Sequence, residues 1–413
     1  MTTTRSRRRI ALVGLFAVIG PGLLAGLSDD DPAGITTYSV LGARTGYELL
    51  WVITLSTLAL IAFHGLGARM GVVTGQGLIG IVRDRYGVRA AAAALGALVL
   101  ANIGTTCAEF AGIAAGAELF GVPRWISVSI AAVGVSALVL RGSFRHVEHV
   151  LIALASVFIA YIAAGLLAHP DWSATLHGLT IPSMSFDRDS VVLVTATVGT
   201  TLAPWGLAFI QSYAVDKRLT VADLRFERID VGIGAVLTGV VGVFVAIACA
   251  ATLHAQGLPI DSASDAARAL EPLAGDLAGT LFALGLIGAA VLAASILPLS
   301  TAYSVSEFVG TESALDDRWS DARPFYATLV VVTIIGAGIV LLPGAPLITI
   351  LVATQVLNAV LLVPLLVFMV GVGRDQHLMG EFRISRTMTS IYAAVIGLVS
   401  ACVVALAATS LLG

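Results

Sequence analysis

Charged residues are scarce in this chain. Aspartate, glutamate, lysine and arginine together make up 12% of its 413 residues, whereas 58% of the residues are hydrophobic. A soluble globular chain carries roughly 25% charged residues. About half that share leaves too little polar surface to cover a water-soluble fold of this length, so the composition excludes an ordinary soluble protein.

The chain also has few cysteines and no enzyme motif. Its three cysteines lie in apolar runs without metal-ligand spacing, so we expect them to be small core residues: Cys107, Cys249 and Cys402. No polar stretch is longer than a loop, and the sequence contains neither a phosphate-binding loop nor a nucleophile motif. Nothing indicates an enzyme, a bound cofactor or a nucleic-acid partner.

Long apolar runs are what this chain has in abundance. Runs of about 18 residues or more are long enough to cross about 30 Å of hydrocarbon as a helix. They must be helical, because lipid offers the backbone no hydrogen-bond partner, and unbroken runs argue against the alternating strands of a barrel. We therefore predict an all-α polytopic membrane protein with about 11 transmembrane helices. The predicted spans lie at about 11–41 (interrupted), 47–70, 92–119, 124–140, 147–168, 190–215 (interrupted), 230–254, 274–306, 325–342, 346–371 and 389–412.

The positive charges predict how these spans are oriented. The chain has 23 lysines and arginines, and all but four fall on one side of the membrane when the spans alternate. The four exceptions are Arg44, Arg124, Arg188 and Arg268. Because cytoplasmic loops carry the excess of positive charge, we predict a multi-pass protein of the cell membrane with a cytoplasmic N-terminus. The lipid bilayer is then its partner. The sequence does not determine the oligomeric state, and a monomer is compatible with it.

Two of the spans carry the same helix-breaking pattern. Residues 31–34 read Asp-Pro-Ala-Gly in the first span, and residues 203–206 read Ala-Pro-Trp-Gly in the sixth. Proline removes a backbone donor and glycine permits non-helical angles, so each motif can break its helix. A lone motif would indicate a plain kink, whereas broken helices at matching places in two halves indicate the central site of a transporter.

Asp31 is the strongest candidate for a functional residue. An acidic side chain at membrane depth is costly and needs a partner, and hard divalent cations prefer oxygen ligands. We expect Asp31 to supply the charge of a metal site, while the broken helix ends supply neutral oxygens. Asp29 and Asp30 are expected to face a water-filled vestibule, where they would concentrate cations.

Several motifs together resemble those of a known family. They are Gly-Pro-Gly-Leu at 20–23, Asp-Pro at 31–32, Thr-Gly-Tyr at 45–47, Ala-Arg-Met-Gly-Val-Val-Thr-Gly at 68–75 and Ala-Glu-Phe-Ala-Gly at 108–112. With these motifs the chain resembles the Nramp family of proton-coupled divalent metal transporters over most of its length, most strongly in its first 120 residues.

The resemblance implies the leucine-transporter-type fold, an inverted 5+5 repeat with broken helices 1 and 6. The chain would then be a single membrane domain, 1–413. Its first repeat would cover about 10–168 and its second about 189–371, and the helix at about 389–412 would be an addition.

The departures from the family pattern bear on the substrate. The family reads Asp-Pro-Gly-Asn in span one, where this chain has Ala33 and Gly34, and Met-Pro-His in span six, where it has Ala203 and Trp205. Thr106 replaces an aspartate of span three. Alanine cannot provide the soft sulfur ligand that favours transition metals, and the missing asparagine leaves space for a partly hydrated ion. The pattern resembles the Nramp-related magnesium transporter branch.

The predicted function is therefore the import of Mg²⁺, and also of Mn²⁺, by alternating access. We expect no proton coupling, because Trp205 stands where the family has a proton-carrying histidine and cannot carry a proton. Glu109 is the remaining acid of the family relay, and we assign it a residual proton-carrying or gating role. The alternatives are a proton-coupled Mn²⁺ or Fe²⁺ transporter of ordinary Nramp type and a sodium-coupled organic-solute carrier of the same fold. A channel or a metal-sensing receptor is an alternative of a different class. A receptor usually needs a cytoplasmic output domain, and no segment of this sequence is long enough to form one.

The resemblance also names the other residues of the ion site. The ion would be bound by Asp31 together with neutral positions: Ser28, Gly34, Thr200, Ala203 and Gln355. For Gln355 a satisfied buried amide is an equal alternative, and Asn358 lies on the same helical face. His64 and His254 have no second ligand at helical spacing, so we expect ordinary structural histidines.

Overall fold

The computed structural model of this protein describes residues 26, 28–140, 160–311 and 322–412. Eight helices among them are long and apolar enough to cross a membrane. They are α4 (Leu50–Thr74), α6 (Val88–Glu118), the broken pair α11 (Arg188–Thr201) and α12 (Pro204–Asp216), α13 (Leu224–Thr252), α16 (Ala278–Val309), α17 (Arg323–Val340), α18 (Leu347–Gly373) and α20 (Arg386–Leu412). The prediction of an all-helical membrane protein is confirmed for the described residues.

The other three predicted spans are represented by shorter helices. These are α3 (Pro32–Thr45), α7 (Arg124–Leu140) and α9 (Ala160–Leu167). The remaining parts of the first and fifth predicted spans, at 11–25 and 147–159, lie outside the described residues. Short helices also occupy stretches that the sequence predicts as loops: α5 (Leu78–Tyr86), α10 (Trp172–Thr180), α14 (Ala263–Ala267), α15 (Glu271–Ala274) and α19 (Gln376–Met379).

Local capping explains why two of these loops contain helices. Asp171 precedes α10 and accepts hydrogen bonds from the backbone N–H groups of Ser173 and Ala174. Ser262 and Asp265 form a capping box at the start of α14. Each device satisfies backbone donors that a helix start leaves free, which stabilises even a short helix.

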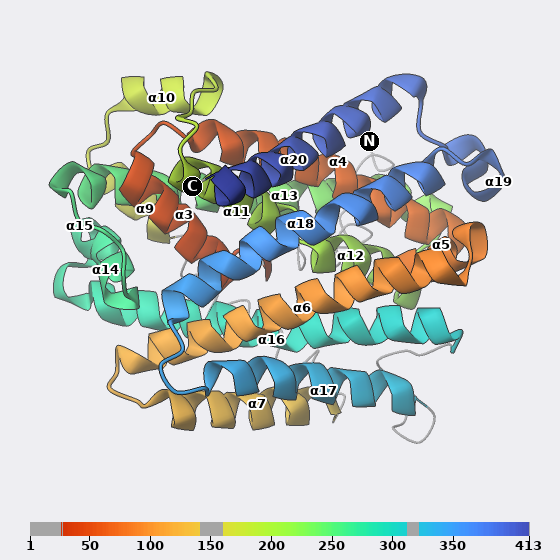
Figure 1. Ribbon diagram of the computed structural model, residues 1–413, viewed down its shortest axis with the longest axis horizontal. Coiled ribbons are helices and arrows are strands. Elements are labelled where there is room, and N and C mark those ends of the chain that lie inside the picture. Colours follow the sequence, from red (N-terminus) through yellow and green to blue (C-terminus); the bar gives the residue numbers. More distant parts are fainter. Residues whose placement is uncertain (1–25, 27, 141–159, 312–321, 413) are drawn as a thin grey trace, which may run out of the picture.

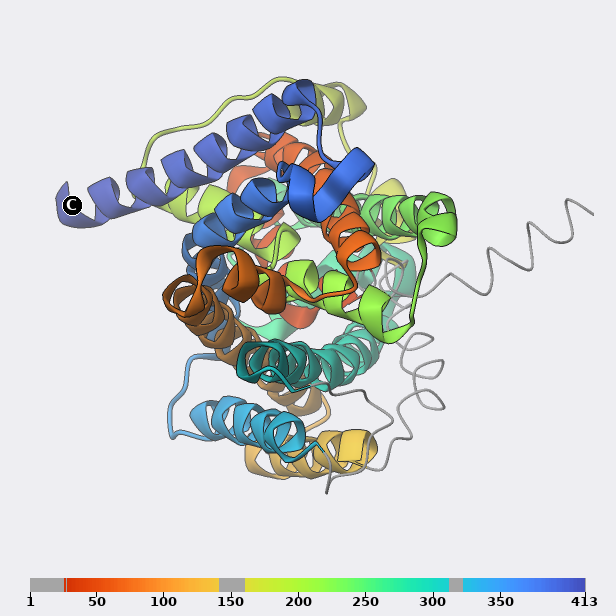
Figure 2. The same ribbon diagram turned by 90° about the vertical axis from the view of Figure 1, so that its right-hand side faces the viewer.

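The helices form a layered bundle (Figure 1). α6 and α16 lie side by side across the middle, and α7 and α17 form a layer beyond them. The broken helices pack on the other side of α6 and α16, together with α4, α13 and α18 (Figures 1 and 2). α20 lies at the edge of the bundle, and only 11% of its apolar window is buried. Most of its apolar surface is therefore exposed at the outside of the bundle.

Small residues allow the inner helices to approach closely. A Cβ atom on Gly42 of α3 would overlap the carbonyl of Ala246 on α13, and one on Gly112 of α6 would overlap the ring of Pro32. Membrane helices gain no hydrophobic driving force from one another, so close packing at such positions stabilises their association. These approaches hold α3 between α6 and α13.

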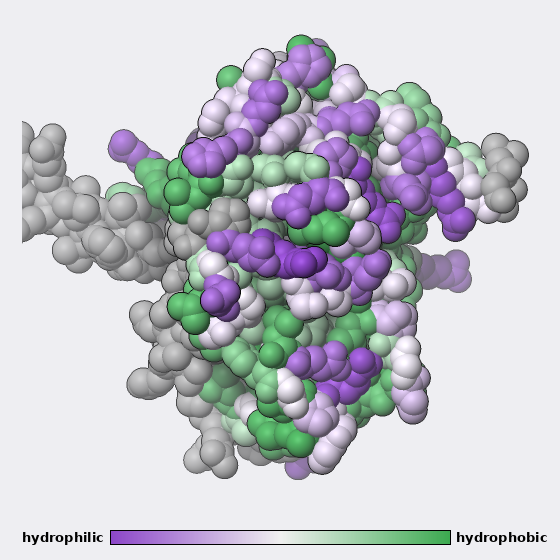
Figure 3. Space-filling model, turned by 90° about the vertical axis from the view of Figure 1, so that its left-hand side faces the viewer, coloured by the Kyte–Doolittle hydropathy of each residue, from purple (hydrophilic) through white to green (hydrophobic). Residues whose placement is uncertain are grey.

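The ends of the bundle differ from its sides. Figure 3 views the end that carries α14 and α15, and hydrophilic residues cross the middle of this face. The sides carry many exposed large apolar side chains, such as Leu58 on α4 and Val404 on α20. This distribution fits a bundle whose sides contact hydrocarbon and whose ends contact water.

Candidate functional site

The first predicted helix break is present at Asp31. Ser28 and Asp29 are helical, Asp30 forms a bend, and α3 begins at Pro32. Asp31 is extended, with φ −76° and ψ 169°, and its side chain accepts a hydrogen bond from the Gly34 N–H at 2.5 Å. Proline suits the first position of a helix and aspartate suits the cap, so the sequence itself specifies a new helix start here.

The second predicted break lies between α11 and α12. α11 ends at Thr201, and Leu202 and Ala203 leave the helical region with ψ values of 47° and 131° before α12 begins at Pro204. The first turn of α12 is anchored to α16, because the Ser300 hydroxyl donates a hydrogen bond to the Trp205 carbonyl at 3.1 Å. Both x-Pro-x-Gly motifs thus interrupt their helices, as predicted.

Oxygen atoms from both broken helices meet at Gly34. A Cβ atom on this glycine would lie 2.8 Å from the Asp29 carbonyl oxygen, and 3.2 Å from both Asp31 Oδ1 and Thr200 Oγ1. Thr200 Oγ1 has no hydrogen-bond partner among the described residues. Asp31 is only 4% exposed. The structure therefore brings three of the predicted residues together at one buried position lined by oxygen atoms, which we call the oxygen-lined space.

Glu109 reaches the same region from α6. It is fully buried, and its carboxyl group lies close enough to that of Asp31 for the two charges to interact. The approach of Gly112 to Pro32 explains this position, since Glu109 lies about one helical turn earlier on the same side of α6. A second acid is thus held beside Asp31.

Gln355 takes part in an amide network next to Thr200. A Cβ atom on Gly199 would overlap the Gln355 carbonyl, so α18 packs directly on α11 here. Asn358 Nδ2 donates to Gln355 Oε1 and to Thr105 Oγ1, each at 2.9 Å. The shared helical face of Gln355 and Asn358 is confirmed. No hydrogen bond joins Gln355 to Asp31 in the part of the chain that the structure describes.

The two remaining predicted positions, Ser28 and Ala203, are both buried. The Ser28 hydroxyl has no partner among the residues described. The Ala203 carbonyl accepts a hydrogen bond from Gly206 N at 3.1 Å, within the first turn of α12. Its methyl side chain offers no donor or acceptor, so neither sulfur nor charge reaches the oxygen-lined space from this position.

Asp29 and Asp30 differ from the expectation of a water-filled vestibule. Their exposed fractions are 2% and 3%. Neither oxygen of the Asp29 carboxyl group has a hydrogen-bond partner among the described residues. Both acids are therefore enclosed by protein rather than facing open solvent, and Asp29 in particular has unused capacity to accept hydrogen bonds or bind a cation.

The acidic residues do not form a multi-ligand cluster. Across 26, 28–140, 160–311 and 322–412, no three His, Cys, Asp or Glu side chains converge as metal ligands would. The oxygen-lined space at Gly34 therefore offers the Asp31 carboxylate with neutral oxygens, and the Glu109 carboxyl group lies beside Asp31. Such a donor set suits a hard cation that keeps part of its water shell.

One histidine lies near the second break, at a place that the sequence did not predict. His64 of α4 is 1% exposed, and its Nε2 atom points toward Gly206 of α12 without a hydrogen-bond partner in the described chain. Its spacing gave no signal, because its neighbours in space come from other helices. His254, by contrast, has an ordinary structural contact, with Nδ1 3.0 Å from the Ala43 carbonyl oxygen.

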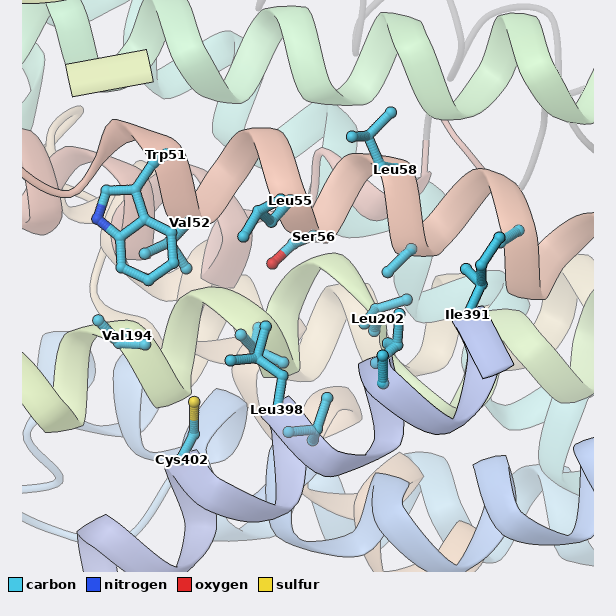
Figure 4. Close-up of a pocket in the computed structure, with 16 residues that line it drawn as sticks. Trp51, Val52, Leu55, Ser56, Leu58, Val194, Leu202, Ile391, Leu398 and Cys402 are labelled. Atoms are coloured by element: carbon cyan, nitrogen blue, oxygen red, sulfur yellow. The ribbon is translucent and has the colours of Figure 1, made fainter. Parts of the chain in front are cut away.

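An apolar groove of the described chain lies elsewhere (Figure 4). It has a volume of about 240 Å³ and lies between α4, α11 and α20. Side chains such as Trp51, Leu55 and Leu398 line it, and it offers almost no polar atoms. An ion would lose its hydration there without replacement, so the candidate site is the polar space at the helix breaks.

Comparison with known proteins identifies the family. Residues 22–409 match the family described as Nramp, natural resistance-associated macrophage protein-like. This chain belongs to the Nramp family. It is 30% identical over 404 residues to a divalent metal cation transporter MntH of Yersinia pestis (strain Pestoides F), covering 94% of this chain and 92% of that protein. It is 29% identical over 339 residues to a protein of the same name from Bacillus subtilis (strain 168), covering 79% and 78% of the two chains.

Solved structures confirm the fold. A crystal structure of the Eremococcus coleocola manganese transporter aligns with a TM-score of 0.76 at 19% identity, covering 96% of this chain and 87% of that one. MhsT, crystallised with L-phenylalanine, aligns with a TM-score of 0.59 at 15% identity, covering 95% and 97%. The predicted leucine-transporter-type fold is therefore confirmed. The division into two repeats and an additional helix stays a prediction.

Proposed function

We propose that this protein imports divalent metal ions across the cell membrane by alternating access at its two broken helices. Mg²⁺ is the main substrate, Mn²⁺ is also carried, and transport is not coupled to protons. The observation that carries this proposal is the oxygen-lined space at Gly34, where one carboxylate and two neutral oxygens meet.

The donor set supports a hard cation. Asp31 contributes the charge, and the Asp29 carbonyl and the Thr200 hydroxyl contribute neutral oxygens. Mg²⁺ dehydrates reluctantly and is usually bound through one or two carboxylates while keeping several waters. Ala203 supplies no thioether, which is the kind of ligand that would favour softer ions. Ser28 and Gln355 complete the proposed set of ion-facing positions.

Relatives of this chain support the wider class of substrate. They are named divalent metal cation transporters, and the structural neighbour is named a manganese transporter. Their names favour divalent ions over an organic solute, which was one of the alternatives raised by the sequence. The preference for Mg²⁺ rests on this chain's own residues at the breaks.

The membrane potential is sufficient to drive such uptake. An inward potential contributes about 2.3 kcal/mol per charge per 100 mV, and a divalent ion gains about twice that. Trp205 lies buried on α12 and has no titratable group. Glu109 lies beside Asp31 and takes a gating role in this proposal. The excess of positive charge supports a cytoplasmic N-terminus in this proposal.

Flux measurements in proteoliposomes test this function. Liposomes containing a Mg²⁺ indicator or a pH-sensitive dye are energised with an inside-negative potential, and Mg²⁺ or Mn²⁺ is added outside. We expect saturable uptake of both ions that depends on the potential and leaves the internal pH unchanged. Metal-dependent acidification would instead support the proton-coupled Mn²⁺ or Fe²⁺ alternative. Flux of Mn²⁺ that ignores excess Mg²⁺ would contradict the substrate assignment.

A further inference from the structure

We propose that Asp29 and His64 form a second cation site beside Gly206, separate from the oxygen-lined space at Gly34. It takes a partly hydrated transition-metal dication of the Mn²⁺, Co²⁺ or Zn²⁺ class. This inference accepts the proposed transport path but does not depend on its preference for Mg²⁺.

The packing of α4 against α12 creates the place for this site. The two helices run in parallel and approach through glycines, because Gly67 of α4 faces Leu207 and Ile210 of α12, and Gly71 faces Gln211. One turn earlier on the same side of α4, His64 faces Gly206. The backbones are therefore close enough for the imidazole to reach the first turn of α12 directly after the break.

Two unpartnered polar groups lie next to Gly206. A Cβ atom at this position would lie 3.2 Å from His64 Nε2 and 3.6 Å from Asp29 Oδ1. Both atoms are buried and have no hydrogen-bond partner among the described residues. Burying an imidazole nitrogen and a carboxylate without partners is costly. A shared ligand that both can bind removes that cost.

Asp29 serves the two places with different atoms. Its main-chain carbonyl oxygen lies at Gly34 beside Asp31 and Thr200, whereas its carboxyl group lies toward Gly206 and His64. The two cation positions are thus neighbours that share one residue. Asp29 lies just before the first helix break, and Gly206 lies in the first turn of α12, just after the second break. Because α4 and α12 run in the same direction from there, the second cation position lies on the side of the Gly34 space toward the end of the bundle where these two helices finish.

The ligand types determine which ion the second position prefers. Imidazole nitrogen suits transition metals, whereas a hard ion such as Mg²⁺ gains little from it. Asp29 would supply the negative charge and water the remaining ligands, as no third acid, histidine or cysteine converges there within the described chain. The Gly34 space offers only oxygen. The two positions therefore differ in selectivity, and transition metals would be retained on the path longer than Mg²⁺.

Pulsed electron paramagnetic resonance of bound Mn²⁺ tests this assignment, because it detects a nitrogen nucleus bound to the metal. The purified full-length protein is studied with Asp31→Asn in the background, which removes the charge of the Gly34 space but neither proposed ligand of the second. We expect nitrogen coupling from one imidazole in Asp31→Asn, and its loss in Asp31→Asn/His64→Gln. The affinity for Mn²⁺ should fall at least about tenfold, since even outer-shell partners of a metal are worth that much.

Two further variants keep the test decisive. Asp31→Asn/Asp29→Asn should weaken Mn²⁺ binding while the remaining bound ion keeps its nitrogen coupling, and this holds even if the His64 variant does not fold. Asp31→Asn/His254→Gln is the matched control and should keep both affinity and coupling. Absence of nitrogen coupling in Asp31→Asn, or its persistence in Asp31→Asn/His64→Gln, overturns the proposal. Neither result depends on Mg²⁺ flux, so a failure of the transport proposal would be seen separately.

Discussion

Asp31 has one observed role, capping α3, and one proposed role, binding the ion, and two substitutions separate them. Its side chain caps α3 by accepting a hydrogen bond from Gly34 N at 2.5 Å, and its charge lies in the oxygen-lined space between the breaks. Asp31→Asn keeps an oxygen that can cap the helix but removes the charge. Asp31→Ala removes both. We expect both variants to lose divalent transport and only the alanine variant to lose stability.

The expected magnitudes follow from capping and Coulomb energies. Replacing a capping aspartate by alanine costs about 1 kcal/mol, whereas asparagine is about as good a cap as aspartate. For the ion, two unit charges about 4 Å apart attract by about 4 kcal/mol at an effective dielectric constant of about 20, and a divalent ion doubles this. Even if desolvation offsets more than half of that attraction, about 3 kcal/mol is lost, which is roughly 100-fold in affinity.

Transport and stability are measured on the same preparations. Mg²⁺ uptake into proteoliposomes reports transport, and thermal unfolding in detergent reports stability. Asp187→Ala is a matched control, because Asp187 caps α11 by accepting from Ser190 N at 2.9 Å and lies outside the spans. It should lose stability but retain transport. Wild-type uptake by Asp31→Asn would refute the ion-binding role, and equal unfolding of Asp31→Asn and Asp31→Ala would refute the capping role.

Further substitutions test the same geometry. Gly34→Ala places a methyl group among the three oxygens, 2.8 Å from the Asp29 carbonyl oxygen, so it should destabilise the protein and lower Mg²⁺ uptake at least tenfold per folded molecule; unchanged uptake would move the ion elsewhere. Ala203→Met with Gly34→Asn should shift competition assays from Mg²⁺ towards Mn²⁺ and Cd²⁺, because it adds a thioether and an amide; unchanged competition would show that other groups select the ion. Gly112→Ala should destabilise the protein by about 1–3 kcal/mol in detergent unfolding, because its Cβ would overlap the Pro32 ring. Hydrogen bonds from Ser185 and Ser190 lower the pKa of the Asp187 carboxyl to about 2. The stability lost in Asp187→Ala should therefore be constant above about pH 4 and become smaller as the pH falls towards 2. An undiminished stability difference between wild type and Asp187→Ala at pH 2 would show that the charge of Asp187 does not stabilise the fold.

The sequence alone determined the long apolar helices and both breaks. Apolar runs long enough to span hydrocarbon can satisfy their backbone only as helices, so the spans follow from local composition. The breaks follow from local chemistry as well, because Pro32 and Pro204 each start a helix and the residues before them leave the helical region. Asp31 was identifiable for the same reason, as an acid within an apolar run.

Only the tertiary structure decided which oxygens and side chains meet. The family resemblance predicted Thr200 and Asp31 for one site, but their approach at Gly34, together with the Asp29 carbonyl oxygen, depends on how α11 packs against the start of α3. His64 gave no signal in the sequence, since its proposed partner comes from another helix and its exposure depends on how α4 packs on α12. Helix formation depends on residues that are neighbours along the chain. A binding site between helices depends instead on how closely those helices approach one another, which glycines such as Gly34 and Gly206 permit but which only the packing of the whole bundle brings about.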